Sequence, residues 1–318
     1  DSSAHFTVFK LKLDRKDPTH YLVDGKSIAL EKKTVEIQVL DNNGKLSKVT
    51  QTLFESIYGP LLIWPDKLDW SKKEAYALRD APLDHDRIFQ QWYEINRADS
   101  VITLRKSVEK TQGAPWVNTL AVDKHGKTIY LNQSVIPYVQ AQQLQQCTVN
   151  NLLALGLPGL DGSNSACNWS VDPSTPQAGI APASQLPVIE RDDFVQSSND
   201  SAWLSNPAAP LVGFSPLTSG DGKELKLRTR FGLSRLQGEH KITAEDLEKL
   251  VFGNQVYLAE LIQDDLKVLC KKFEEKKESA AVLRACSVIT NWNGKAGTDS
   301  DLGIMYFYFF ADYFFNTP

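Results

Sequence analysis

Apolar and polar residues alternate along the first fifty positions of the chain, and this period of two indicates strands. HFTVFKLKL (5–13) has apolar residues on both faces, while TVEIQVL and LSKVTQTLF flank the turn sequence DNNGK (41–45). An Asn-Gly pair between two alternating segments predicts a β-hairpin. YGPLLIW (58–64) continues the strand pattern. We therefore expect residues 1–83 to be mainly strands in an antiparallel sheet with one polar face.

The spacing of apolar residues changes to that of an amphipathic helix in residues 84–110. Ile88 and Trp92 recur at helical spacing, and a second apolar stripe follows Asp99. Asp99 is expected to cap the second helix, because its side chain can accept from the first free backbone N–H groups. Near the other end of the chain, Thr243 followed three residues later by an aspartate resembles a capping box.

Four further segments follow from composition and periodicity. Residues 116–138 are predicted to form a second hairpin around the turn KHGK. Residues 141–193 become rich in Gly, Pro and Ser, and we expect a long surface excursion, which in a compact domain is usually functional or stapled. Residues 194–238 open with the polar loop FVQSSNDSAWLSNP, and residues 243–315 are predicted to be helices. The last of these, around IMYFYFFADYFF, is expected to be buried.

The composition is that of a globular α+β protein. Of the 318 residues, 42% are hydrophobic and 23% charged, and the formal net charge is −4. This charge gives no electrostatic reason to expect nucleic-acid binding. No apolar stretch reaches the ~20 residues that a membrane-spanning helix needs. The chain starts at Asp1 without an initiator methionine or a signal sequence and stops soon after the aromatic helix, so we expect a piece of a larger protein.

The four cysteines form two close pairs in the sequence, Cys147 with Cys167 and Cys270 with Cys286. Neither pair has C-x-x-C spacing and no histidine lies near, so a zinc site is not expected. Two local disulfides in an oxidising compartment are the preferred interpretation, and four reduced core thiols are the alternative. A bridge between Cys270 and Cys286 would join two helices.

Catalytic motifs of the common hydrolases are absent from the sequence. It contains no H-E-x-x-H, no G-x-S-x-G and no P-loop. The five histidines are scattered, and His5, at the start of a strand, is expected to be structural. The loop FVQSSNDSAWLSNP remains: it can turn the chain, or it can direct the amide of Asn199 into a cleft.

Six stretches, taken in order, resemble blocks of the penicillin-amidase family of N-terminal-nucleophile acylases. They are DRKDPTHYLVDGKSIALEKKTVEIQV (14–39), TLFESIYGPLL (52–62), EAYALRDAPLDHDRIFQQWYEINRADSVITLRKSV (74–108), WVNTLAVDKHGKTIYLNQSVIPY (116–138), FVQSSNDSAWLSNP (194–207) and RTRFGLSRL (228–236). The resemblance covers nearly the whole chain. VDGK, SNDSAWLSNPAAPL, RLQG and both cysteine pairs are most similar to the acyl-homoserine-lactone and aculeacin-type acylases of the family.

The resemblance implies a fold and a mechanism. The fold would be part of an αββα sandwich with antiparallel sheets and helical insertions. In the family a serine at the start of the β chain attacks the substrate, its own α-amine acts as the base, and an asparagine amide holds the oxyanion. By position that asparagine is Asn199, and Arg228 matches an arginine beside it. Arg230 and Arg235 share the segment, and each arginine could instead be solvated or salt-bridged.

The acyl pocket implied by the resemblance includes Trp92, Trp116 and Val117. Aromatic walls suit a fatty acyl chain, because they offer a large rigid apolar surface. The alternative for Trp92, on the apolar face of a helix, is a plain core position. Where related penicillin acylases carry calcium ligands this chain reads SSAH (2–5), so no metal is expected, and no cofactor either.

The resemblance thus predicts the central part of an acylase β subunit. The serine nucleophile would lie on polypeptide before Asp1, so this chain alone would be inactive. Its partners would be the α subunit, the rest of the β subunit and an N-acylated small molecule, in the periplasm or outside the cell. The alternatives are a non-catalytic acylase-derived binding domain and an unrelated secreted α+β binding domain.

Overall fold

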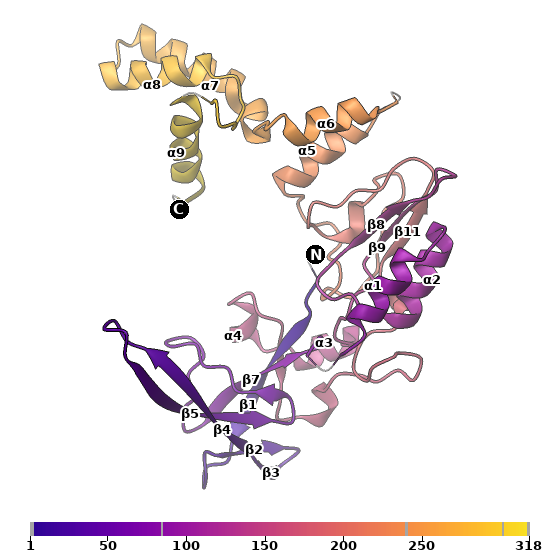
Figure 1. The fold of residues 1–318 in the computed structure, drawn as a ribbon. Coiled ribbons are helices and arrows are strands. Elements are labelled where there is room, and N and C mark those ends of the chain that lie inside the picture. Colours follow the sequence, from indigo (N-terminus) through magenta and orange to yellow (C-terminus); the bar gives the residue numbers. More distant parts are fainter. Residues whose placement is uncertain (1–2, 84, 239–240, 301, 317–318) are drawn as a thin grey trace. The chain divides into compact units, whose positions relative to one another are not determined.

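The structure, a computed structural model, describes residues 3–83, 85–238, 241–300 and 302–316. The chain divides into two compact units, Asp1–Glu224 and Leu225–Pro318. The first unit holds every described strand, and the second is helical (Figure 1). The predicted α+β class is confirmed.

The core of the first unit is built around strand β1 (Phe6–Leu13). It pairs antiparallel with β7 (Glu74–Asp80) and with β2 (His20–Val23), which pairs with β3 (Lys26–Ala29). A short strand, β10 (Gly159–Asp161), lies parallel to β1. The expectation of a wholly antiparallel sheet is therefore wrong at this one pairing. Phe9, Leu11 and Leu13 are buried in one core cluster, and the alternate residue Val8 is buried in a second.

A long hairpin extends from this sheet. Strands β4 (Glu31–Leu40) and β5 (Leu46–Ser56) pair over their full length around the predicted turn at Asp41–Lys45, and β6 (Gly59–Pro60) adds a short third strand. Of the strand expected over residues 58–64, only Gly59–Pro60 is a regular strand, and Leu61 and Trp64 form isolated bridges. Figure 1 shows the hairpin reaching away from the rest of its unit.

A second sheet carries the residues of functional interest. Its order is β11 (Val188–Arg191), β9 (Thr128–Leu131) and β8 (Thr119–Val122), all antiparallel. Helices α1 (Ile88–Asn96) and α2 (Val101–Thr111) lie beside it (Figure 1), and apolar residues of α2 pack on β9. The N-cap of α2 is Ser100, not Asp99 as expected, and the Asp99 carboxylate accepts from the Thr103 hydroxyl instead.

The excursion at 141–193 contains more regular structure than its composition suggests. Helices α3 (Ala141–Cys147) and α4 (Asn150–Leu153), strand β10 and the 3-10 helices η1 (Ser165–Cys167) and η2 (Ala183–Gln185) all lie within it. The Cys147–Cys167 disulfide, with an S–S distance of 2.06 Å, ties α3 to η1 as predicted.

The second unit consists of helices, and it includes the predicted capping box. They are α5 (Leu227–Leu236), α6 (Ala244–Phe252), α7 (Tyr257–Glu275), α8 (Ala280–Asn291) and α9 (Leu302–Asn316). Thr243 and Asp246 exchange both capping hydrogen bonds at the start of α6, which confirms that prediction. The Cys270–Cys286 disulfide joins α7 to α8.

The aromatic helix α9 is not buried as expected. Phe307 is 3% exposed and packs on Trp292, but neighbouring side chains of the helix lie open to solvent. The exposed large ones in the described part of the helix are Leu302, Met305, Tyr306, Tyr308, Phe309 and Tyr313. An apolar composition predicts that a helix will be covered, and in the described part of this chain only one face of α9 is.

Candidate active site

Asn199 occupies an exposed, left-handed position in the loop between β11 and the 3-10 helix η3 (Ala202–Leu204). Its φ is 59°. Among residues with a side chain, asparagine is one of the few that adopts this conformation at low cost. The local backbone therefore explains an asparagine here as a turn former, and the residue is exposed.

The loop around Asn199 is anchored on both sides. Gln196 donates through its backbone N–H to the Ser205 carbonyl (3.0 Å) and through its side chain to the Leu204 carbonyl (3.2 Å). On the other side the Ser201 hydroxyl lies 2.8 Å from the Ser219 hydroxyl and donates to the Gly220 carbonyl at 2.7 Å. These anchors restrict the backbone around Asn199, and none of them involves the Asn199 side chain.

The base of the same loop is held by a cluster of charge and amide groups. The buried Asn206 donates to the Asp193 carboxylate (3.0 Å) and to the Phe194 carbonyl (2.8 Å). Arg191 forms an ion pair with Asp193 at 2.7 Å. Hydrogen bonds from Arg191 chiefly, then from the Phe194 backbone and Asn206, hold the pKa of Asp193 well below its usual range. The carboxylate stays ionised and keeps the loop closed at its base.

Trp116 and Val117 lie next to this loop. The following residue, Asn118, donates from its side-chain amide to the Ser197 hydroxyl at 3.0 Å, two residues before Asn199. Trp116 is 51% exposed and Val117 36%. The structure thus joins the segment predicted to line an acyl pocket to the loop predicted to hold the oxyanion.

His5, the residue before strand β1, packs against Trp116. The His5 ring is buried and its centroid is 4.3 Å from that of Trp116, with 36° between the ring planes. Ser3 donates to the Thr218 carbonyl and accepts from Asn132. His5 and Asn118 did not stand out in the sequence, because neither belongs to a motif and their partners are 130 and 79 residues away.

Trp92 belongs to helix α1 and is not a core residue. It is 47% exposed, whereas the preceding Gln91 is fully buried. The Gln91 side-chain oxygen accepts from the Gly113 backbone N–H at 3.1 Å, and Arg87 donates to the Thr111 and Gln112 carbonyls. These bonds tie α1 to the segment that leads into Trp116. The pocket role of Trp92 stays a prediction.

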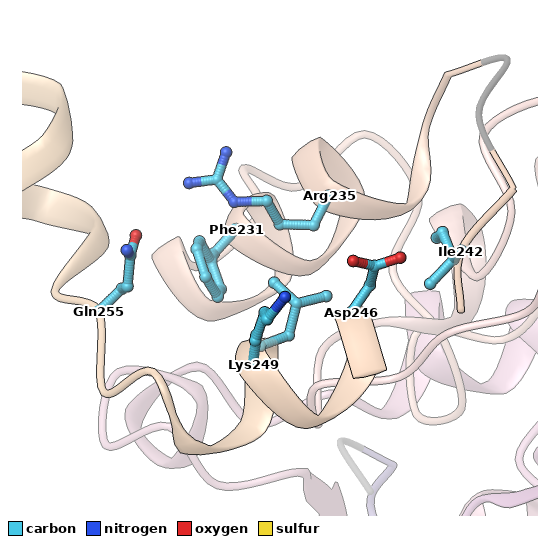
Figure 2. Close-up of a pocket in the computed structure, with 7 residues that line it drawn as sticks. Phe231, Arg235, Ile242, Asp246, Lys249 and Gln255 are labelled. Carbon is cyan, nitrogen blue, oxygen red and sulfur yellow. The ribbon is translucent and has the colours of Figure 1, made fainter. Parts of the chain in front are cut away.

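Arg228 lies on helix α5 of the second unit, and its catalytic role stays a prediction. Arg230 and Arg235 lie on the same helix. Arg235 forms an ion pair with Glu260 and lies 4.9 Å from the Phe231 ring centroid. Figure 2 shows Arg235 and Phe231 at a pocket of the second unit, with Asp246 and Lys249 facing them from α6. Arg228 is not among the residues that line this pocket.

Neither a metal cluster nor a membrane-spanning helix occurs among the residues that the structure describes. No group of three or more histidine, cysteine, aspartate or glutamate side chains there could hold an ion. No helix there is long and apolar enough to cross a membrane. Of the SSAH stretch, Ser3 and His5 have the structural contacts given above, and Ser2 lies outside the described residues.

Comparison with known proteins identifies close relatives. The chain is 49% identical over 308 residues to an acyl-homoserine lactone acylase, PvdQ, of Pseudomonas putida, and 48% identical over 310 residues to that of Pseudomonas fluorescens. It is 33% identical over 317 residues to aculeacin-A acylase of Actinoplanes utahensis. These alignments cover 94–96% of this chain but only 39–40% of the relatives, so the chain spans about two fifths of their length.

A solved structure agrees in fold. A thermostable penicillin G acylase from Alcaligenes faecalis matches with a TM-score of 0.57 and 15% identity, over 94% of this chain and 47% of the other. That likeness concerns the fold alone, and it agrees with the expected N-terminal-nucleophile fold. The penicillin amidase family model matches residues 2–317, which excludes an unrelated binding domain. The chain belongs to the penicillin amidase family.

Proposed function

We propose that this chain is the central part of an amidohydrolase that cleaves the amide bond of N-acylated small molecules. The observation that carries the proposal is the accessible, left-handed Asn199 in a loop anchored on both sides and joined to the half-exposed Trp116 segment. A carboxamide suits an oxyanion because it donates a hydrogen bond without a titrating charge, and a fixed loop places it before charge develops.

In the proposed mechanism the nucleophile is an N-terminal serine on polypeptide that precedes Asp1. Its oxygen bonds to the substrate carbonyl carbon while its α-amine takes the proton, and the amine product leaves with that proton. Water then releases the fatty acid from the acyl ester. Asn199 donates to the carbonyl oxygen while it is negative, and Arg228 orients that amide.

The proposed substrate carries a fatty acyl chain. Trp92, Trp116 and Val117 offer accessible apolar surface, which favours an acyl chain over a polar group. The names of the relatives, acyl-homoserine lactone acylase and aculeacin-A acylase, favour an acyl-homoserine lactone or a lipopeptide.

The proposed partner is the remaining polypeptide of the acylase. One face of the hairpin β4–β5 carries Ile37, Val39, Val49 and Leu53, each at least 39% exposed. A two-stranded hairpin is only marginally stable by itself, so an apolar face of this kind is expected to be covered. The exposed side of α9 is a second such surface. We also propose that the chain alone lacks activity.

The proposed location is the periplasm or the exterior of the cell. Two disulfides account for all four cysteines. Structural disulfides persist in oxidising compartments and are rare in reducing ones.

The test is an activity measurement on the intact, matured acylase. It is expected to release homoserine lactone from an acyl-homoserine lactone, while the 318-residue chain by itself does not. Replacing the N-terminal serine of the intact protein with alanine serves as the inactive control. An intact protein without a serine at the maturation site, or without turnover of any N-acyl substrate, would favour the non-catalytic binding domain.

A further inference from the structure

Trp116 has a backbone conformation that a large residue rarely adopts. Its φ is 67°, in the left-handed region. A non-glycine residue there costs on the order of 1–3 kcal/mol and persists only where its surroundings hold it. The contacts that hold Trp116 therefore determine where its indole lies.

The chain on both sides of Trp116 is anchored by hydrogen bonds, one to a backbone carbonyl and one from a side-chain amide. Two residues before it, the Ala114 carbonyl accepts from the buried Ser134 hydroxyl at 2.9 Å. Two residues after it, Asn118 donates to Ser197 at 3.0 Å. Between these two points the Trp116 side chain extends from the segment with half of its surface exposed.

His5 supports the other side of the indole. The imidazole ring is 1% exposed and lies 4.3 Å from the Trp116 ring, centroid to centroid. Its Nδ1 lies 2.9 Å from the Val135 carbonyl oxygen. Because a carbonyl only accepts, Nδ1 carries the hydrogen, and this bond fixes the plane of the ring. Ser134 and Val135, adjacent in the chain, thus hold both the Trp116 backbone and the ring on which its indole rests.

We propose that His5 is a positioning residue that keeps the Trp116 indole in place as a wall of the acyl pocket, and that it thereby sets the preference for long acyl chains. The inference rests on the proposed function, since it concerns the same site. A fixed indole contacts the far methylene groups of a long chain, which a short chain lacks. The loop that carries Asn199 is also anchored by Gln196 and Ser201, through bonds that do not involve His5, so His5 is expected to affect acyl-chain selectivity more than the chemical step.

Three variants of the intact acylase test the role of His5. His5→Ala removes the supporting ring, His5→Phe keeps a ring and removes the hydrogen bond to Val135, and His125→Ala is a control at an exposed turn. The assay compares kcat/KM for dodecanoyl- and hexanoyl-homoserine lactone. His5→Ala is expected to lower the ratio of the two values about tenfold, the loss of roughly two methylene contacts.

The pattern of the kinetic constants separates positioning from general damage. For His5→Ala, kcat on the short chain is expected to stay within about threefold of wild type, and the loss is expected in KM for the long chain. His5→Phe restores most of the ratio, and His125→Ala leaves it unchanged. Equal losses on both chains, or an unchanged ratio in a folded His5→Ala protein, would overturn the proposal.

A crystal structure of the His5→Ala enzyme gives a readout that does not depend on activity. The Trp116 indole is expected to leave its place, and its φ is expected to leave the left-handed region. An unmoved Trp116 would refute the role of His5 while leaving the proposed function intact. A wild-type enzyme with no activity on either substrate would instead remove the proposed function, and the selectivity role with it.

Discussion

Replacing Asn199 with glycine in the intact acylase tests the proposed oxyanion donor with little disturbance of the fold. Glycine adopts the left-handed φ of 59° at no steric cost, whereas alanine would add strain there. The hydrogen bonds of Gln196 and Ser201 that anchor the loop do not involve the Asn199 side chain. Because glycine keeps this backbone conformation, the free energy of unfolding is expected to change by about 1 kcal/mol or less.

The expected effect on catalysis is much larger. Removing one oxyanion donor costs about 3 kcal/mol of transition-state stabilisation, which corresponds to a fall in kcat of about 10²-fold. KM is expected to change little, because the donor acts on the charge that develops in the transition state. Asn199→Asp is expected to lose more, since a carboxylate puts an acceptor and a negative charge where a donor is needed.

The assay follows release of homoserine lactone from an N-acyl substrate under single-turnover and steady-state conditions. A matched control is Asn254→Gly, the same substitution at another exposed asparagine with a positive φ, 49°. It is expected to leave kcat unchanged. If Asn199→Gly keeps kcat within about threefold of wild type while folded, the assignment of Asn199 as the donor is refuted.

Three stability predictions follow from the structure. Reduction of the two disulfides, which close loops with sequence separations of 20 and 16, is expected to cost about 3 kcal/mol for each bridge. A lower Tm under reductant and four added hydrogens in the mass of the denatured chain, two for each bridge, would show it, and an unchanged mass would contradict it. Thr243→Ala removes both the cap and the bond to Asp246, and the free energy of unfolding measured by chemical denaturation is expected to fall by about 1 kcal/mol. Thr243→Ser, which keeps the hydroxyl, is the conservative control. Burial lowers the pKa of His5 below 6.5, so the unfolded chain takes up a proton that the folded chain does not. The free energy of unfolding is therefore expected to fall as the pH drops from 6.5 through the lowered pKa. An equally steep fall in the His5→Phe variant would contradict this.

Local signals in the sequence predicted local structure well. The turn DNNGK joins β4 and β5, where the Asp41 carboxylate accepts from the backbone N–H groups of Asn43 and Lys45. The capping box of Thr243 begins α6. Such features depend on residues within four positions of each other, so the sequence contains the whole interaction.

Long-range structure was harder to predict. Strand β10 is three residues long and pairs with β1, about 150 positions earlier, and no periodicity of Gly159–Asp161 indicates that pairing. The exposure of α9 was missed because apolar composition indicates that a surface needs covering but does not indicate what covers it. Both errors concern interactions with distant parts of the polypeptide.

The residues of the candidate site also differ in how far the sequence alone could suggest them. Asn199 and the Trp116–Val117 pair could be proposed from the sequence because the blocks around them resemble those of a family. His5 and Asn118 could not, because their role depends on contacts with Val135 and Ser197 that only the folded chain creates.

The most direct test of the central claim is a crystal structure of the matured acylase with a boronic acid analogue of the acyl chain bonded to its N-terminal serine. The tetrahedral boronate places an oxygen where the oxyanion forms. We predict that the Asn199 side-chain nitrogen lies about 3 Å from that oxygen. An Asn199 amide more than about 5 Å away, with another group in hydrogen-bond contact with the oxygen, would contradict it.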